Sequence, residues 1–321
     1  MNCVLGLDGG GTKTECVVLN EVGAIVARAT GPPSNPTRIG FPAALAAIQE
    51  TCASAIESTR IRFDVLALCA GLAGTGLPEN RDQMRQFLAQ RFPMAIVDVR
   101  MDIELPLAAM PPGPAIVLVV GTGSAAIGRD ATGAIKREGG FGPAISDEGS
   151  AFDIGRSASV AAREGNCSGE SDQLTRQIFP HLGVKNWAEL DLKSAANADS
   201  VYPRVFPVVA AAADAGNAVA QSILRSAAEK LAAISYRLAQ SLKLLQEPFP
   251  LGKTGGAIGR SRSSIEPLTT LYAPRSPTRS LLPCRSSQPK SPHGLPCSST
   301  GTGQEPHREF HGLLRFANRY R

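Results

Sequence analysis

The strongest constraint on the fold is a glycine-rich turn that follows each of two short apolar segments. Residues 3–8 form an apolar run that leads into three glycines at 9–11, and residues 114–120 lead into a Gly-Thr-Gly-Ser turn at 121–124. Short apolar runs that end at glycine are typical of buried strands followed by tight turns. The recurrence of the pattern predicts a duplicated α/β unit whose halves face each other across a cleft.

The periodicity of the surrounding sequence supports this duplication. In the first half we expect strands at 3–8, 14–19, 24–29, 65–69 and 95–99, and helices at 41–56 and 81–92. In the second half we expect a strand at 114–120, a hairpin of 125–129 with 133–137, helices at 147–164, 187–196 and 217–245, and a strand at 249–254. The hairpins distinguish this order from a pure Rossmann unit. We therefore predict one domain over residues 1–110 and a second over 111–259.

The composition changes after residue 259. Residues 260–321 contain eight Pro, ten Ser and no Asp, and they lack any sustained apolar period. Such composition predicts an irregular, solvated tail. One alternative is a tail that binds phosphate or nucleic acid. A third interpretation, which we favour as a hypothesis, is that these residues are translated out of frame. An Arg/Ser/Pro-rich sequence is typical of GC-rich DNA read in the wrong phase, and the change comes directly after a predicted strand, a Gly-Gly turn and the start of a helix.

Charge and apolar content exclude several classes of protein. The tail carries ten basic and three acidic residues, a balance of +7, whereas residues 1–259 carry 23 basic and 25 acidic residues, a balance of −2. The body therefore offers no basic stripe for nucleic acid. The longest apolar runs, near 115–120 and 208–213, are too short to span a membrane, and Asp8 interrupts the only N-terminal apolar stretch. We expect a cytoplasmic protein with no membrane partner.

The seven cysteines show no metal-ligand or disulfide pattern. None forms a CxxC pair or a Cys/His cluster, and their number is odd. We interpret them as thiols in a reducing compartment.

The first glycine turn has the composition of a phosphate-binding loop. Residues 7–14 read Leu-Asp-Gly-Gly-Gly-Thr-Lys-Thr, and successive glycine N–H groups can form a concave nest for phosphate oxygens. Asp8 ends the preceding strand, where a carboxylate can hold Mg²⁺ or its waters. The spacing is not that of a Walker A loop. The structural alternative is a tight hairpin with a capping aspartate.

Three further glycine turns follow in the same relation to predicted strands. They are Gly-Thr-Gly-Ser at 121–124, Gly-Gly-Phe-Gly at 139–142 with Ser-Asp-Glu-Gly-Ser at 146–150, and Thr-Gly-Gly-Ala at 254–257. The first can cradle phosphate, and the last suits backbone packing against a nucleotide base. Taken alone, residues 121–124 have a simpler interpretation as an ordinary β-turn. Likewise, Asp147 taken alone has a simpler interpretation as a helix N-cap.

Together these segments resemble the N-acetylglucosamine and glucosamine kinases of the BadF/BadG ATPase group, over residues 1 to about 259. Residues 6–14 are similar to the family's first phosphate motif, and residues 121–124 are similar to its second. Residues 139–156 are similar to the family's sugar-site segment, and residues 254–258 are similar to its adenosine motif. The resemblance implies an α/β fold of two actin-like (ribonuclease H-like) domains around a central cleft for nucleotide and sugar. Related ROK kinases carry a zinc-binding cysteine cluster, and nothing in this sequence resembles it.

The resemblance also implies an activity and a set of site residues. The expected reaction is ATP- and Mg²⁺-dependent phosphorylation of N-acetylglucosamine or glucosamine at O6. Asp102, at the position of the family's catalytic aspartate, would accept the hydroxyl proton, and Asp8 would organise Mg²⁺ through water. The alternatives for Asp102 are a helix N-cap, or that Asp98 or Glu104 holds the catalytic position. ATP would contact Gly10, Gly11, Thr12, Lys13, Thr14, Gly121, Thr122, Gly123, Gly255 and Gly256. The sugar would contact Asn35, Asp102, Gly140, Phe141 and Asp147.

Two other functions fit the same sequence. Some members of the wider group are ATPase activators of reductases or dehydratases, which hold an iron–sulfur cluster between subunits, but Cys167 has no matched cysteine here. A degenerate, non-enzymatic sugar-binding protein is the second alternative. The oligomeric state stays open, although kinases of this family often form homodimers.

Overall fold

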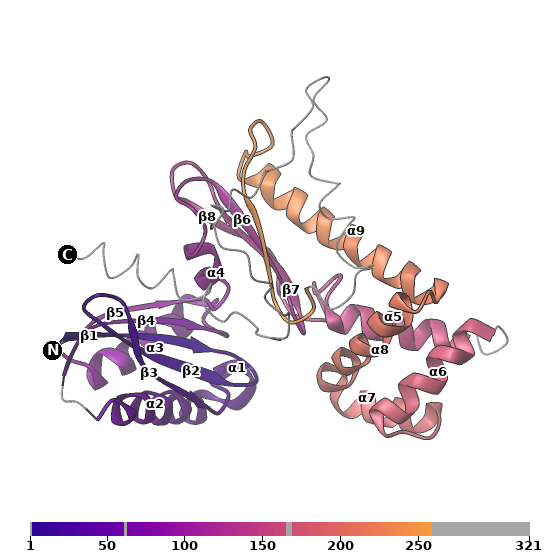
Figure 1. Ribbon diagram of the computed structural model, residues 1–321, viewed down its shortest axis with the longest axis horizontal. Helices are drawn as coiled ribbons and strands as arrows, with labels where there is room; N and C mark the ends of the chain where they lie inside the picture. The colour runs from indigo at the N-terminus through magenta and orange to yellow at the C-terminus, as the bar shows by residue number, and fades with distance from the viewer. Residues whose placement is uncertain (1, 61–62, 165–168, 259–321) are drawn as a thin grey trace, which may run out of the picture.

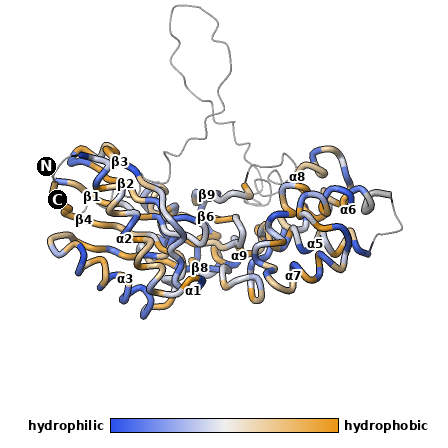
Figure 2. Tube along the Cα trace, turned by 90° about the horizontal axis from the view of Figure 1, so that it is seen from below, coloured by the Kyte–Doolittle hydropathy of each residue, from blue (hydrophilic) through white to orange (hydrophobic). Residues whose placement is uncertain are grey.

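The computed structural model describes residues 2–60, 63–164 and 169–258 (Figure 1). The tail expected to be irregular, residues 260–321, lies outside the described residues. Two β-sheets and their helices form the described part. The first sheet lies at one end of the molecule with α2 and α3, the helices α5–α8 lie at the other end, and the second sheet lies between them (Figures 1 and 2).

The first sheet has five strands in the order β3-β2-β1-β4-β5. β1 (Asn2–Gly9), β2 (Thr14–Asn20) and β3 (Ile25–Gly31) are antiparallel neighbours, and β4 (Asp64–Leu72) and β5 (Ile96–Arg100) continue the sheet in parallel with β1. Its helices are α1 (Pro36–Ile39), α2 (Phe41–Ser58), α3 (Pro78–Arg91) and α4 (Glu104–Ala108).

The second sheet repeats the layout of the first four strands. β6 (Ala115–Val120), β7 (Ser124–Arg129) and β8 (Ile135–Gly139) are antiparallel neighbours, and β9 (Leu251–Thr254) pairs in parallel with β6 on its other side. Between β8 and β9 the chain forms α5 (Ala151–Glu164), α6 (Gly169–Leu182), α7 (Trp187–Val201), the 3₁₀ helix Tyr202–Val205, α8 (Phe206–Asp214) and α9 (Ala218–Ser241).

The predicted strands are all present in the structure, with ends displaced by at most three residues. Several helix limits were wrong, and the helix predicted over 187–196 extends to Val201. The helix predicted from residue 147 begins at Ala151, because Gly149 has a φ of +75° and cannot extend a right-handed helix. The helix predicted to reach residue 245 ends at Ser241, and Lys243 follows with a φ of +58°. Helices α6 and α8 were not predicted.

The predicted domain limits stay a prediction. The strand β5 ends at Arg100 and β6 begins at Ala115, so the two sheets fall on opposite sides of the predicted limit near residue 110.

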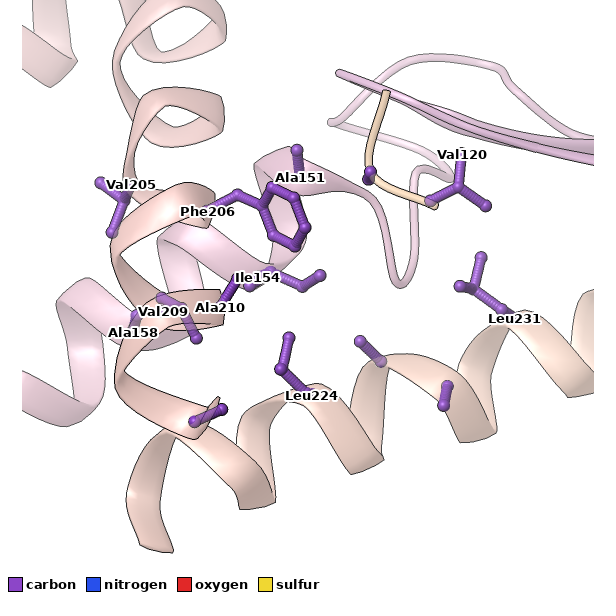
Figure 3. Close-up of a cluster of buried hydrophobic side chains, with 14 of the residues drawn as sticks. Val120, Ala151, Ile154, Ala158, Val205, Phe206, Val209, Ala210, Leu224 and Leu231 are labelled. Carbon is purple, nitrogen blue, oxygen red and sulfur yellow. The ribbon is translucent and has the colours of Figure 1, made fainter. Parts of the chain in front are cut away.

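Each sheet buries one face against its own helices. In the first sheet Leu5 and Leu7 of β1 pack with Ile48 of α2. In the second, alternate residues of β6 face a larger core formed with α5, α8 and α9 (Figure 3). Hydrophobic and hydrophilic positions alternate along the strands and helices of both ends (Figure 2). Among the described residues, no helix combines the length and apolar character needed to cross a membrane.

The short helix α4 packs against both sheets. Its Leu105 packs with Val17, Leu19 and Cys69 of the first sheet, while its Leu107 packs with residues of the second sheet, including Val117. The two faces that the larger helices leave uncovered therefore meet at α4. As a result, the turn that precedes α4 and contains Asp102 lies between the two sheets.

Candidate functional site

A cavity of about 760 Å³ lies where the connections of the two sheets meet. From the first sheet's connections, its lining includes Asn35, Arg38, Gly74, Asn80, Met101 and Asp102. From the second sheet and its connections, it includes Gly121, Thr122, Gly123, Arg137, Gly140, Phe141 and Asp147. The volume is within the range of small-molecule sites, so the cavity is large enough for a sugar and part of a nucleotide.

Asp102 lies in the turn between β5 and α4. Its Oδ1 accepts a hydrogen bond from the backbone N–H of Ile103 at 2.9 Å, and its carbonyl accepts one from Leu105 at 3.2 Å. Glu104 accepts the N–H of Met101 at 3.2 Å, which closes the same turn. Burial raises the pKa of the Asp102 carboxyl, and the Ile103 hydrogen bond and the charge of Arg137 oppose that rise. A fixed, partly desolvated carboxylate of this kind is suited to accept a proton.

Asn35 precedes α1 and lines the same cavity. Its side-chain oxygen accepts hydrogen bonds from the backbone N–H and the hydroxyl of Thr37, at 3.0 and 2.7 Å. Among the described residues no acceptor contacts its amide nitrogen, so its two N–H donors are available to a ligand. Gly74 has a φ of +83° and passes so close that a side chain there would collide with Asn35.

Asp147 connects the predicted sugar segment to the second glycine turn. Its Oδ1 accepts the N–H of Ser124 at 3.1 Å, and a Cβ at Gly123 would lie 2.7 Å from the same oxygen. Burial raises the pKa of the Asp147 carboxyl, as do the charges of Asp199 and Glu148, whereas the Ser124 hydrogen bond and Arg38 lower it.

Gly140 and Phe141 form the rim of the cavity next to β8. Gly140 has a φ of +74°, and a Cβ there would lie 2.8 Å from the Ala125 side chain. Phe141 is 54% exposed, and the guanidinium of Arg137 lies 4.5 Å from the centroid of its ring. The rim therefore offers an aromatic face and a cation to a bound ligand.

The second glycine turn is held by the start of α5. Gly121 donates to the carbonyl of Gly123 at 2.8 Å, while Ala151 and Phe152 donate to the carbonyls of Gly121 and Thr122 at 3.0 and 3.2 Å. A Cβ at Gly121 would meet no atom within 4 Å, so space remains above the turn. Among the described residues the backbone N–H groups of Thr122 and Gly123 have no protein acceptor, so these two donors are the ones compatible with a bound phosphate group.

The predicted adenosine motif lies beside this turn. Gly255 has a φ of +110°, and a Cβ there would collide with the carbonyl of Val120. Ala257 donates to the same carbonyl at 3.0 Å. Gly255 and Gly256 do not line the cavity itself, but they adjoin the strand end that leads into Gly121.

The first glycine turn lies outside the cavity lining. Gly10 donates to the carbonyl of Lys13 at 2.9 Å, and Thr12 and Lys13 are exposed. A Cβ at Gly11 would lie 3.3 Å from Nη1 of Arg38, which does line the cavity. The turn therefore adjoins the cavity through Arg38.

Thr14, predicted to bind phosphate, is fully buried. Its hydroxyl lies 2.6 Å from the Pro32 carbonyl and 2.8 Å from the Ser34 hydroxyl. These contacts favour a supporting role for Thr14 behind the turn.

Asp8 is the penultimate residue of β1 and is half-buried. In the described part of the chain, no group of three or more His, Cys, Asp or Glu side chains is arranged to hold a metal ion. A single carboxylate beside a phosphate site is compatible with Mg²⁺, because that ion keeps several waters and uses phosphate oxygens as ligands.

Several lining residues were not predicted. Arg137, Arg38 and Asp199 bring charge to the cavity, and Arg38 and Asp199 lie 3.8 Å apart although 161 positions separate them in the sequence. No local pattern reveals such a pair. The alternation of β8, which sets Arg137 on the face opposite Lys136, was the one available signal for Arg137.

Comparison with known proteins gives a consistent result. A sequence model of the BadF/BadG/BcrA/BcrD ATPase family matches residues 5–266. The N-acetyl-D-glucosamine kinase of Dictyostelium discoideum is 28% identical over 274 residues, which cover 80% of this chain and 85% of that protein. The N-acetylmuramic acid/N-acetylglucosamine kinase of Clostridium acetobutylicum is 27% identical over 263 residues, covering 80% and 86%.

Solved structures show the same architecture. A Chromobacterium violaceum protein provisionally named as an N-acetylglucosamine kinase superposes with a TM-score of 0.69 at 24% identity, over 83% of this chain and 91% of that chain. A ROK family glucokinase from Streptomyces griseus, solved with glucose and AMPPNP, superposes with a TM-score of 0.53 at 20% identity, over 84% and 88%. The predicted fold class, two actin-like α/β units, is confirmed.

Proposed function

The chain belongs to the BadF/BadG/BcrA/BcrD ATPase family, and from this premise we propose that it transfers the γ-phosphoryl group of ATP to an amino sugar. The observation that carries the proposal is the convergence of Asp102, Asn35 and Asp147 on one cavity with the turn at Gly121 and Gly123. This set combines a proton acceptor, sugar-binding polar groups and a phosphate-binding turn. The two curated relatives, both named as N-acetylglucosamine kinases, support the same chemistry.

In the proposed reaction a sugar hydroxyl oxygen forms a bond to the γ-phosphorus as the bond between that phosphorus and the β-phosphate oxygen breaks. Asp102 accepts the hydroxyl proton, and ADP is the leaving group. Such transfers depend mainly on positioning and on neutralising charge. Because Asp102 must be ionised to accept the proton, activity falls as the pH drops through its raised pKa.

The polar groups around Asp102 would orient the sugar. The free N–H donors of Asn35 suit hydroxyl oxygens, and the carboxylate of Asp147 suits hydroxyl donors. A primary hydroxyl such as O6 reaches farther from the ring than the secondary ones, so we place O6 at Asp102. N-acetylglucosamine and glucosamine are the two proposed acceptors.

The two glycine turns would hold ATP. The phosphates would lie against Gly121, Thr122 and Gly123 and against the first turn, with the base near Gly255 and Gly256. Mg²⁺, held by Asp8 through water, would neutralise phosphate charge when bound.

The test is a coupled ADP-release assay with a panel of N-acetylglucosamine, glucosamine, N-acetylmuramic acid and glucose. We expect turnover with an amino sugar, and phosphorus–proton correlation by NMR identifies O6 as the phosphorylated oxygen. Binding of the sugar without ADP release contradicts the kinase proposal and favours a degenerate sugar-binding protein. If the sugar is phosphorylated at another oxygen, the kinase proposal stands and only the assignment of O6 as the acceptor oxygen is contradicted.

A further inference from the structure

Arg137 presents a cation to the cavity from the second sheet. Successive side chains of β8 point to opposite faces. Lys136 donates to the carbonyl of Ser241 at 2.8 Å, and Glu138 forms an ion pair with Arg237 of α9 at 2.6 Å, so these two face α9 and its C-terminal end. Arg137 lies on the other face and lines the cavity.

The guanidinium of Arg137 reaches across to the first sheet's connections. Its Nη1 lies 3.7 Å from the sulfur of Met101, the residue that precedes Asp102, and a Cβ at Gly76 would lie 3.5 Å from the same nitrogen. On its other side the guanidinium covers the ring of Phe141 at 4.5 Å. Among the described residues no carboxylate forms an ion pair with Arg137. These contacts hold a cation against the residue that precedes Asp102, and no carboxylate of the described residues pairs with that cation.

We propose that Arg137 is a positioning residue for the reaction: its guanidinium, held by Met101 and Phe141, places a positive charge on the cavity wall next to the turn that carries Asp102. The proposal rests on the proposed function, in which Asp102 is the base. Arg137 acts through Asp102, and the proton still passes from the sugar hydroxyl to that carboxylate.

The electrostatics of Asp102 agree with this geometry. Burial raises the pKa of its carboxyl, and among the described side chains the charge that lowers it is that of Arg137. The other charged groups nearby have partners or lie elsewhere on the cavity wall. Arg100 of β5 pairs with Asp98 at 2.7 Å and lies 3.9 Å from Glu104 of α4. The remaining charged side chains of the lining are Arg38, Asp147 and Asp199.

A purely structural role for Arg137 is the alternative. Its guanidinium covers Phe141, so its loss could alter the rim and weaken sugar binding without affecting Asp102. The two roles differ in what they change. A structural role alters the KM for the sugar at every pH, whereas the proposed role shifts the pH at which activity appears.

The experiment compares Arg137→Gln, Arg137→Lys and the matched control Lys136→Gln. The control removes the same charge from the adjacent position of β8, on the opposite face. In Arg137→Gln we expect the acid limb of the kcat/KM profile to move up by about half to one pH unit, because an opposite charge is lost from the surroundings of a carboxylate. Below the midpoint this lowers kcat/KM by about three- to tenfold. In Arg137→Lys we expect the acid limb to lie close to its wild-type pH, because the positive charge is kept. In Lys136→Gln we expect the acid limb to stay at its wild-type pH.

A second readout does not depend on turnover. Carbon-detected NMR of the full chain follows the titration of the Asp102 carboxyl without sugar or ATP, and Asp102→Asn identifies the signal. We expect its midpoint to rise in Arg137→Gln and not in Lys136→Gln. Coincident titrations of wild type and Arg137→Gln overturn the proposal, as does an equal shift in the Lys136→Gln control. If the titration shifts but no sugar is phosphorylated by the wild type, the proposed function fails while the Arg137–Asp102 interaction stands.

Discussion

The turn at residues 9–14 and the turn at residues 121–124 occupy equivalent places in two sheets of the same strand layout, yet they are supported differently. The first joins β1 to β2 and lies on the buried hydroxyls of Thr14 and Ser34. The second joins β6 to β7 and is held by Asp147 and by the first N–H groups of α5. Only the second lines the cavity.

In this arrangement the duplicated strands form a scaffold, and we propose that the connections after them determine the chemistry. In the first half the connection from β5 to α4 places Asp102 between the sheets, and the segment after β3 places Asn35. In the second half the segment between β8 and α5 supplies Asp147. Loops positioned by a rigid scaffold commonly carry function for this reason.

The largest effect is expected from Asp102, the residue of the first half that we propose as the base. Asp102→Asn keeps the size of the side chain and removes the proton acceptor, so kcat should fall by about 10²–10⁴-fold while sugar binding changes little. Steady-state kinetics and calorimetric titration with the sugar measure the two quantities. Asp98→Asn, on the neighbouring strand β5, is the matched control and should retain turnover within about threefold. A kcat for Asp102→Asn within the same range as the control assigns the base elsewhere.

The cores of the two halves should respond similarly to truncation. Leu5 of β1 and Leu118 of β6 are both fully buried, and replacing either by Ala should lower the free energy of unfolding by about 2–5 kcal/mol. Urea unfolding with hydrogen exchange shows which strands lose protection. If the predicted domain limits are right, each substitution weakens mainly the half that contains it.

The exposed Leu192 of α7 provides the control, because its replacement by Ala removes no core contact and should cost less than about 0.5 kcal/mol. Uniform loss of protection in both halves would show that they unfold as one cooperative unit and would argue against two separable domains.

The sequence predicted the scaffold well because its signals are local. The apolar run 3–8 ended by glycines, and the apolar spacing of residues 217–245, each depend on neighbours within a few positions. Helix α8 was missed because its run of alanine and valine is apolar on every side, so it lacks the amphipathic period that identifies a surface helix.

The candidate site was predictable only in part. Resemblance to known motifs indicated Asp102, Asn35 and Asp147, and the structure brings all three to one cavity. Arg38 and Asp199 could not be found in this way, because their proximity depends on how the two halves pack together. Their ion pair joins α1 to α7, and no local period connects those segments.

The two glycine turns can be distinguished by adding a methyl group to each. A Cβ at Gly9 would collide with Ser34 and Leu72 inside the first half, whereas a Cβ at Gly123 would press on the carboxylate of Asp147. We expect Gly9→Ala to lower the thermal midpoint, by an amount that reflects about 1–3 kcal/mol of overpacking. Gly123→Ala should instead raise the KM for the sugar with a smaller change in the midpoint.

Thermal unfolding and steady-state kinetics of both variants make the comparison, with each variant serving as the control for the other. Equal losses of stability and of sugar affinity in the two variants would show that the turns are equivalent and would contradict the distinction drawn above.

The smallest effect is expected at the ion pair between the halves. Arg38 and Asp199 are 48% and 47% exposed and lie 3.8 Å apart, and such pairs contribute about 0–1 kcal/mol. Asp199→Asn should therefore leave the thermal midpoint nearly unchanged, and any difference from wild type should vanish in high salt.

The same change removes a charge that raises the pKa of Asp147, so Asp147 stays ionised to a lower pH and sugar binding persists further into acid. Calorimetric titration with the sugar across pH measures this shift, and Asp191→Asn, which removes an exposed carboxylate of the same helix outside the cavity, is the control. A large fall in the thermal midpoint that persists in high salt would mean that this pair, more than the packing around α4, holds the two halves together.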